Sequence, residues 1–427
     1  MKSTRIWTLL LLFGLALALP PAAAAANITI VNLDAGTGQG LDDPTPAAPI
    51  GTNPGTTLGE QRLNAFNRAA NIWGLLLNSS VTVRVQATFT PLPCNAGSAT
   101  LGAAGAISIS ANFPNATLPN TWYHAALANA QAGSDQDPAN DDIVAFFNSS
   151  IDNNPACLAG IDWYYGLDGS PPGSDIDFLT VILHELAHGL GFSSFIDSAG
   201  NPPGPPFLDD VWNYFLYDAT LMLLWKDMTP AQRVFSSTNT GNLVWSGASV
   251  TAASGILTAG INAATGFVQM YAPPAFSGGS SVSHWDTALF PNELMEPFLS
   301  LTTDDPSLAV PLMADIAWST NPQVYWLYKP IPGQAGKNNL FSTTNGTAGA
   351  TTYILFGTAA GARPVPGCPG VFVGINAPQV LTSGANDALG NFDFTAFVGG
   401  GAAGQTFIFQ AVELTTCTVS NRFRATF

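Results

Sequence analysis

The spacing of apolar residues varies along this chain, and each spacing predicts a different kind of element. After residue 57, apolar side chains recur every three or four positions. One stripe then carries Leu63, Phe66, Ala70, Trp73 and Leu77. That period is typical of a helix with one buried face. The preceding Thr57-Leu58-Gly59-Glu60 has the form of a capping box, so we expect the helix to begin there.

Alternation of apolar and polar residues predicts strands on both sides of this helix. These strands are Ile28–Val31 and Val81–Phe89. Leu101–Ile109 and Asp142–Phe147 can supply further strands. A short helix is expected around Tyr123–Ala130. Strand, helix, several strands and a further helix is the order of an α+β fold, in which the sheet backs the second long helix.

The second long helix is predicted over the apolar stretch Val181–Phe192. Asp175 or Asp177 can cap its N-terminus and interact favourably with the helix dipole. Gly189 and Gly191 allow the chain to stop and turn sharply at the other end. Leucines and alanine cover most of its faces, as expected for a helix buried below a cleft.

Three polar residues of this helix have the spacing of a metal site. Residues four apart lie on one face, so His184 and His188 can direct two imidazoles at one ion. Glu185 lies where its carboxylate can reach a water bound to that ion. This is the H-E-x-x-H arrangement of zinc hydrolases, in which Zn²⁺ makes a nucleophile from water near neutral pH. The alternative is an exposed helix that carries the pattern by chance.

A catalytic zinc site normally has three protein ligands and one open position for water. Besides His184 and His188, the chain contains only His124 and His284. His124 lies in an apolar helical segment, where a lone histidine is usually structural. His284 stands in a Ser-His-Trp segment, and Met295 follows it 11 residues later, shortly before a proline.

These two blocks resemble the leishmanolysin branch of the metzincins, which are secreted zinc proteases. Metzincins extend the motif to H-E-x-x-H-x-x-G-x-x-H; here Gly191 takes the glycine position, but Ser194 stands in place of the last histidine. In the leishmanolysin branch the third histidine is displaced far downstream, within a His-Trp segment. A Leu-Met turn then closes beneath the metal. Ser283-His284-Trp285 and Leu294-Met295-Glu296-Pro297 look like these two features.

The resemblance implies a role for each matching residue. His184, His188 and His284 would be the zinc ligands, and Glu185 the general base that takes a proton from water and passes it to the leaving amine. Met295 would pack beneath the site without coordinating. Otherwise His284 is a hydrogen-bonded structural histidine and Met295 an ordinary core methionine.

Residues 199–280 give no functional signal. Glycine and proline at nearly every position of 200–206 predict a turn-rich loop, and a helix is expected to start at Thr229-Pro230. Beyond the second block, Pro306–Trp318 predicts a short helix, because apolar residues recur there at helical spacing.

Turn residues over Tyr328–Gln334 predict a linker. Short alternating runs separated by Gly-rich turns follow at Thr352–Phe356, Val371–Ile375, Phe392–Val398, Thr406–Val412 and Arg422–Phe427. This pattern is typical of a small antiparallel β-sandwich. The region has no histidine and few acids, so we expect it to carry no chemistry. By analogy, its role would be attachment to a surface or a polymer.

The formal net charge is −16, and only 9 % of residues are charged. Such a surface argues against nucleic acid as a partner, because phosphate binding needs clustered Lys and Arg. The acidic segment Asp135–Asp142 has enough oxygen ligands to hold Ca²⁺. Its spacing matches no known cation loop, and a solvated acidic loop is the alternative.

Residues 1–26 are typical of a secretory signal, with Lys2 and Arg5 before the apolar run Trp7–Leu19 and an alanine tract after it. That run is too short to span a bilayer comfortably, and no later segment is long enough. We therefore expect the mature protein to be exported and soluble.

Four cysteines fit an oxidising compartment. Of three possible connectivities, Cys94–Cys157 and Cys368–Cys417 keep each bridge inside one expected domain. The rival role is a free thiolate that blocks the zinc in a latent form.

These patterns predict an α+β chain in three parts: a signal peptide at 1–26, a metzincin-like catalytic domain at 27–327 and a β-sandwich domain at 328–427. The expected function is that of a secreted zinc endopeptidase acting on a protein or peptide. The alternatives are a catalytically silent binding or adhesion protein that retains the fold, and a zinc hydrolase of non-peptide bonds. An intact Glu185 disfavours the silent protein.

Overall fold

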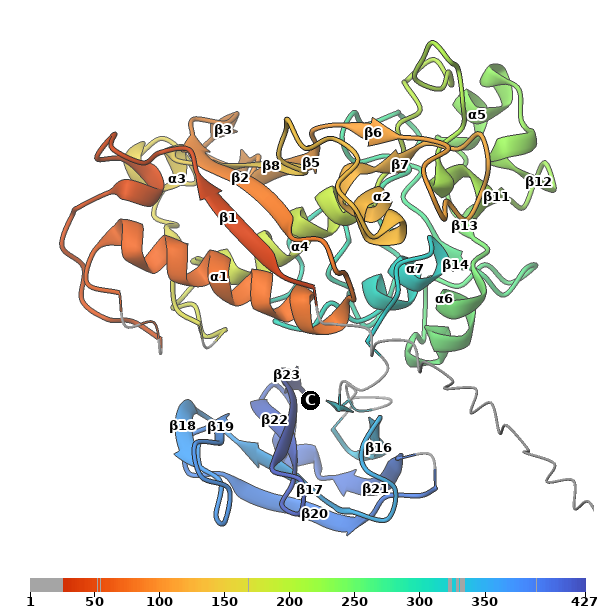
Figure 1. Cartoon of the computed structure of the whole chain (residues 1–427). Coiled ribbons are helices and arrows are strands. Elements are labelled where there is room, and N and C mark those ends of the chain that lie inside the picture. Colours follow the sequence, from red (N-terminus) through yellow and green to blue (C-terminus); the bar gives the residue numbers. More distant parts are fainter. Residues whose placement is uncertain are drawn as a thin grey trace, which may run out of the picture.

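The computed structural model describes residues 26–427 apart from 52, 54, 168, 322–324, 328–329, 331–334 and 389. The predicted signal sequence up to residue 25 and most of the predicted linker lie outside the described residues. The fold is mixed α+β, with an N-terminal body that contains the α-helices and a set of C-terminal sheets below it in Figure 1. None of the described helices is both long enough and apolar enough to cross a membrane.

A four-stranded sheet forms the frame of the body. Its order is β1 (Ile28–Asn32), β2 (Val83–Thr90), β8 (Ile143–Asn148) and β5 (Gly102–Ala106). The first three strands are parallel, and β5 pairs antiparallel with β8 at the edge. Each of the four overlaps a segment predicted to be a strand and ends no more than one residue beyond it, apart from the shorter β5. In β2 every second residue is buried, which explains its alternation of apolar and polar residues.

Two long helices pack together beside this sheet, α1 (Leu58–Leu76) and α4 (Phe178–Leu190). Trp73 of α1 is fully buried and donates from its indole to the carbonyl of Leu183 at 3.0 Å. Thr57 caps α1 by accepting from the backbone N–H of Glu60. The Glu60 carboxylate bonds to Thr56 instead of the capping residue, so only half of the expected capping box forms.

Both ends of α4 are fixed by residues that the sequence indicates. Asp177 caps the N-terminus by accepting from the backbone of Thr180 at 2.7 Å. At the C-terminus Gly191 has φ +136°, and a Cβ there would lie 2.6 Å from Cδ1 of Ile316. Only glycine fits this sharp exit, which directs the chain after α4 along the cleft.

The remainder of the body consists of shorter elements. The helices are α2 (Ala125–Ala132), α3 (Ser150–Asn153), α5 (Pro230–Ser236), α6 (Ala248–Ala253) and α7 (Ala309–Asp315). A second sheet has the order β12 (Leu223–Leu224), β11 (Leu216–Asp218), β13 (Leu243–Trp245) and β14 (Val268–Gln269). Two-residue strands are β3 (Cys94–Asn95), β4 (Ser98–Ala99), β6 (Ile109–Ser110), β7 (Tyr123–His124), β9 (Trp163–Tyr164) and β10 (Ile176–Asp177). Helices α2, α5 and α7 lie where the sequence predicts them, whereas the second sheet has strands too short to show alternation.

The C-terminal strands all pair antiparallel. One sheet has the order β15 (Trp326–Leu327), β16 (Lys337–Thr344) and β21 (Phe392–Val398). Another has the order β20 (Gln379–Ala385), β17 (Thr351–Gly357), β22 (Thr406–Glu413) and β23 (Thr418–Thr426). Strands β18 (Ala360–Pro364) and β19 (Phe372–Ile375) form a hairpin. Sequence reasoning missed β16, β18 and β20, whose composition is largely polar or small.

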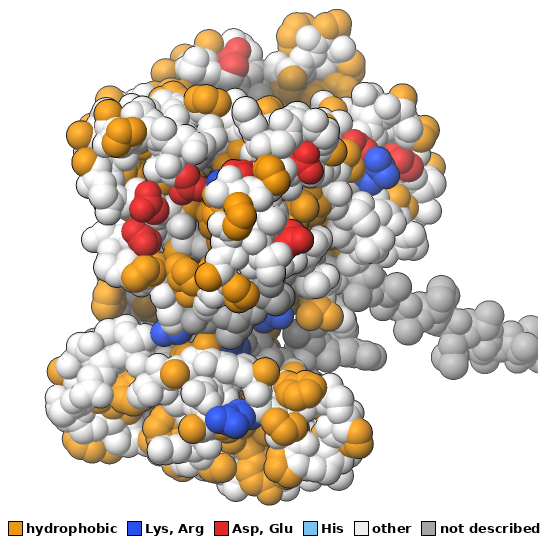
Figure 2. All heavy atoms as spheres, turned by 90° about the vertical axis from the view of Figure 1, so that its left-hand side faces the viewer, with side chains coloured by type: hydrophobic (Ala, Val, Ile, Leu, Met, Phe, Trp, Pro, Cys, Tyr) orange, Lys and Arg blue, Asp and Glu red, His pale blue; other side chains and the backbone are white. Residues whose placement is uncertain are grey.

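Arginines of β23 join these sheets to the body. Arg422 donates to the carbonyl of Leu167 at 2.8 Å and lies 3.8 Å from the carboxylate of Asp304. Arg424 donates to the hydroxyl of Ser170. Figure 2 shows several Lys and Arg side chains along the junction between the two parts, while the Asp and Glu side chains on that face lie on the body.

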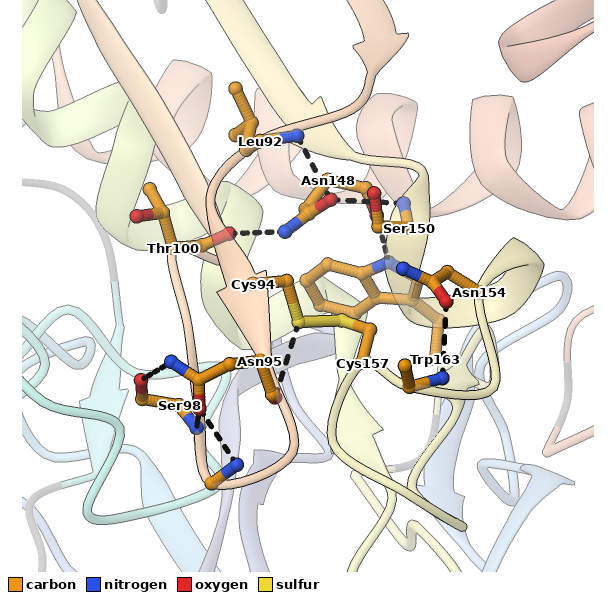
Figure 3. The surroundings of a disulfide bond; sticks show 12 residues. Leu92, Cys94, Asn95, Ser98, Thr100, Asn148, Ser150, Asn154, Cys157 and Trp163 are labelled. Atoms are coloured by element: carbon orange, nitrogen blue, oxygen red, sulfur yellow. Dashed lines mark hydrogen bonds between the residues drawn. A yellow bond between two sulfur atoms is a disulfide. The ribbon is translucent and has the colours of Figure 1, made fainter.

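Both predicted disulfides are present, Cys94–Cys157 with Cα atoms 5.3 Å apart and Cys368–Cys417 with Cα atoms 5.4 Å apart. No described cysteine is free, which excludes the latent thiolate. Beside the first bridge, Asn148 accepts from Leu92 N–H and donates to the carbonyl of Thr100 (Figure 3). The bridge and this amide fix the loop that leads into β5, the strand nearest the candidate site.

Candidate metal centre

Three histidines from two distant segments converge at one point. His184 and His188 lie one turn apart on α4, and His284 comes from the chain between β14 and α7. The three Nε2 atoms are each 3.1 Å from the other two. Within the part of the chain that the structure describes, this is the one group of His, Cys, Asp or Glu placed to hold a metal ion.

A backbone carbonyl orients each of the three rings through its other nitrogen. The Nδ1 atoms lie 2.7 Å from the carbonyl of Leu294 for His184, 2.7 Å from that of Phe192 for His188 and 2.9 Å from that of Ser280 for His284. A carbonyl can only accept, so every Nδ1 must carry the ring proton. In the neutral ring, Nε2 is then a bare lone pair that points at the other two.

Burial keeps these rings neutral. Loss of solvation lowers the pKa of His184 to about 4 and that of His188 to about 3, and it holds the pKa of His284 well below its ordinary value. Three facing lone pairs repel one another and have no hydrogen to share. Ligands of a tetrahedral zinc ion are about 3.3 Å apart, close to the spacing seen here. The donor set therefore fits a metal ion.

Glu185 lies beside this cluster, and its side chain and the three histidines line one cavity. It is only 7 % exposed, and burial raises the pKa of its carboxyl to about 8. The backbone of Ala104 in β5 faces the carboxyl and partly offsets this rise. At Gly102 a Cβ would lie 2.9 Å from Cγ of Glu185, so glycine lets the edge strand approach closely. A cation at the histidines would lower the pKa of Glu185, because opposite charges favour the ionised carboxylate.

The cavity in front of these residues has a volume of about 690 Å³. Its walls are the edge strand β5 with the residues before it, the face of α4 that carries the two histidines, and the segments around 278–284 and 294–301. The described lining residues include no Lys, Arg or Tyr. The cleft is thus bounded on one side by the free edge of a strand and on the other by the histidine cluster.

Met295 is fully buried in the hydrophobic core of the body. Its backbone carbonyl accepts from Trp285 N–H at 2.8 Å, which connects the segment around Met295 to the residue after His284. The preceding residue, Leu294, supplies the carbonyl that orients His184. The segment around Met295 therefore helps to position two of the three histidines, and the role of the methionine beneath a metal stays a prediction.

The other two sequence candidates, His124 and the acidic segment, do not belong to the described group of possible metal ligands. His124 is fully buried, and its Nε2 lies 2.7 Å from the hydroxyl of Ser193. In the acidic segment, Asp135 and Asp142 both accept from the side chain of Asn129, and Asp141 pairs with Arg84. These carboxylates are bonded to protein donors, so the prediction of bound Ca²⁺ gains no support.

Sequence reasoning missed the groups that orient the rings. They are the backbone carbonyls of Phe192, Ser280 and Leu294, which no side-chain pattern can reveal. Sequence reasoning also missed Ser193, which lies just after the C-terminal end of α4 and lines the cavity.

A scan against protein-family models gave no match, and neither did searches of curated proteins and of solved structures. The function must therefore be inferred from the geometry of the site.

Proposed function

We propose that this protein is a zinc-dependent endopeptidase of metzincin type, similar to the leishmanolysin branch. The observation that supports this most is the convergence of three neutral imidazoles, with Nε2 atoms 3.1 Å apart and each Nδ1 held by a carbonyl. Neutral nitrogen donors favour zinc over magnesium or calcium, which prefer oxygen. Three protein ligands and an open cavity are the arrangement of a catalytic zinc site rather than a structural one.

When bound, zinc would supply the positive charge that acidifies a water molecule and polarises the substrate carbonyl. The remaining work belongs to Glu185. Its carboxylate, ionised beside a cation, takes the proton from the attacking water and later transfers it to the departing amine nitrogen. Burial under β5 limits the access of bulk water to this carboxyl, which keeps the proton near the reacting atoms.

The free edge of β5 supports a peptide substrate. An extended chain can pair with the unpaired N–H and C=O groups of an edge strand, which orients its backbone independently of its sequence. Ala103 and Ala104 of this strand line the cavity, and their small side chains leave room for a peptide. The described wall also lacks the Lys and Arg side chains that phosphate esters require. These features favour an endopeptidase over a zinc hydrolase of non-peptide bonds.

Export through the N-terminal signal belongs to the same proposal, as does attachment through the C-terminal sheets. Two disulfides support an oxidising compartment.

Casein digestion tests the proposal. We expect the wild type to cleave casein and Glu185→Gln, which keeps the size of the side chain but cannot take a proton, to be at least about a hundredfold slower. The variant should retain its zinc and its unfolding temperature. Digestion that persists unchanged in Glu185→Gln would exclude this mechanism, and a wild type that binds zinc without cleaving would favour the silent binding protein.

A further inference from the structure

His124 and Ser193 form a pair beside the candidate metal centre that the proposed mechanism does not use. His124 precedes α2, is fully buried, and packs its ring on Phe195 with centroids 4.3 Å apart. Its Nε2 lies 2.7 Å from the Oγ of Ser193. Ser193 lines the same cavity as the three histidines. A ring buried in the body therefore reaches the cleft through one hydroxyl group.

The other ring nitrogen determines where the proton of His124 lies. Its Nδ1 is buried and has no hydrogen-bond partner among the described residues. A proton on Nδ1 would be an orphaned buried donor, which is rarer in proteins than an unused acceptor. The proton therefore belongs on Nε2, and Nε2–H donates to Ser193.

This assignment leaves the hydroxyl hydrogen of Ser193 available. A hydroxyl that accepts from an imidazole N–H can still donate its own hydrogen. Three other hydroxyls of the wall donate to protein acceptors: Ser194 to Asp210, Ser300 to Glu296 and Thr180 to the carbonyl of Thr303. Since the described wall has no Lys, Arg or Tyr, an oriented hydroxyl is the strongest side-chain donor that it can offer to a substrate oxygen.

We propose that Ser193, held by the buried His124, donates its hydroxyl hydrogen to a carbonyl oxygen of the bound peptide. Ser193 is then a substrate-binding residue, and His124 is a positioning residue that acts through it. This inference rests on the proposed endopeptidase function and adds a second polar contact on the substrate, besides the metal.

Steady-state kinetics test the contact, with a quenched fluorescent peptide that contains the best-cut bond of casein. We expect Ser193→Ala to lower kcat/KM about tenfold, the effect of one hydrogen bond. His124→Leu should lower kcat/KM by a similar factor. The double variant should lose no more of kcat/KM than either single variant, because each of the three variants removes the same contact with the substrate. His124→Gln, whose amide can donate in place of the ring, should recover part of the loss. Ser198→Ala, exposed on the same loop, is the matched control and should leave kcat/KM unchanged.

Nitrogen NMR of histidine-labelled protein gives a readout that needs no activity, because it shows which ring nitrogen carries the hydrogen. The His124 signal is identified by its absence from His124→Gln, and we expect Nε2–H. An Nδ1–H ring, or a Ser193→Ala enzyme with kcat/KM within about twofold of the wild type, overturns the inference. A wild type without Glu185-dependent cleavage would instead overturn the proposed function, and the NMR result would still decide the position of the proton.

Discussion

The N-terminal body and the C-terminal sheets both bury polar side chains, but in opposite ways. In the C-terminal sheets, Asn386 donates to Glu413 at 2.6 Å and accepts from the hydroxyl of Thr352 at 2.6 Å. In this cluster of Asn386, Glu413 and Thr352, each hydrogen-bond donor faces an acceptor. In the body, three imidazole nitrogens face one another at 3.1 Å with no hydrogen between them.

This difference separates a structural polar cluster from a functional one. A satisfied cluster fixes how strands pair and needs nothing from outside the chain. A convergent set of acceptors is unfavourable alone, and becomes favourable only when a cation neutralises the repulsion.

Metal removal should have the largest effect, and it should be confined to the body. Zinc present at about 1,000 times its Kd stabilises the folded state by about 4.1 kcal/mol, and EDTA removes this contribution. We expect hydrogen exchange to become faster in α4 and around His284, and to stay unchanged in β17 and β22. Equal changes in both regions would contradict the comparison.

Asn386→Leu should destabilise the C-terminal sheets without affecting the metal centre. The variant removes one buried hydrogen bond from Glu413 and one from Thr352, which costs about 1–3 kcal/mol. Glu413 keeps its bond from the backbone N–H of Thr347, and Thr352 keeps its bond with the Tyr325 hydroxyl. Chemical denaturation measures the loss, and zinc content and casein digestion should not change. Gln405→Leu, at an exposed position of the same region, serves as the control and should shift stability by less than about 0.5 kcal/mol.

The pH dependence of stability should respond to His124. Burial lowers the pKa of this ring to about 3, whereas the unfolded chain takes up the proton near its ordinary pKa of about 6.5. The unfolded state therefore binds more protons between these values, and stability falls as pH falls below about 6.5. His124→Gln cannot take up this proton.

Urea unfolding of the metal-free proteins measures this effect. The loss of stability between about pH 6 and pH 5 should be smaller in His124→Gln by up to about 1.4 kcal/mol. Identical pH profiles for the two proteins would show that the ring is not held neutral by burial.

The sequence could predict elements whose signals are local. The cap at Asp177, the glycine exit at Gly191 and the four-residue spacing of His184 and His188 each depend on neighbours in the chain. The alternation of β2 follows from the burial of one face, so this strand was also predictable. Both disulfide pairings follow from the division of the chain into two parts.

Other features depend on contacts between distant segments. His284 could be placed with the other histidines only through a family resemblance, because no periodicity links residues 100 apart. The carbonyls that orient the rings have no side-chain signature. Strands of two or three residues such as β12 and β14 are stabilised by tertiary contacts, and their composition carries no alternation.

The most direct test is the zinc content of the purified protein, measured by mass spectrometry alongside His284→Ala. We expect about one zinc per wild-type chain. His284→Ala should lose the zinc with its circular dichroism spectrum retained, while His124→Gln keeps it. A wild type that binds no transition metal, or a His284→Ala variant with full zinc occupancy, would contradict a centre built from all three histidines.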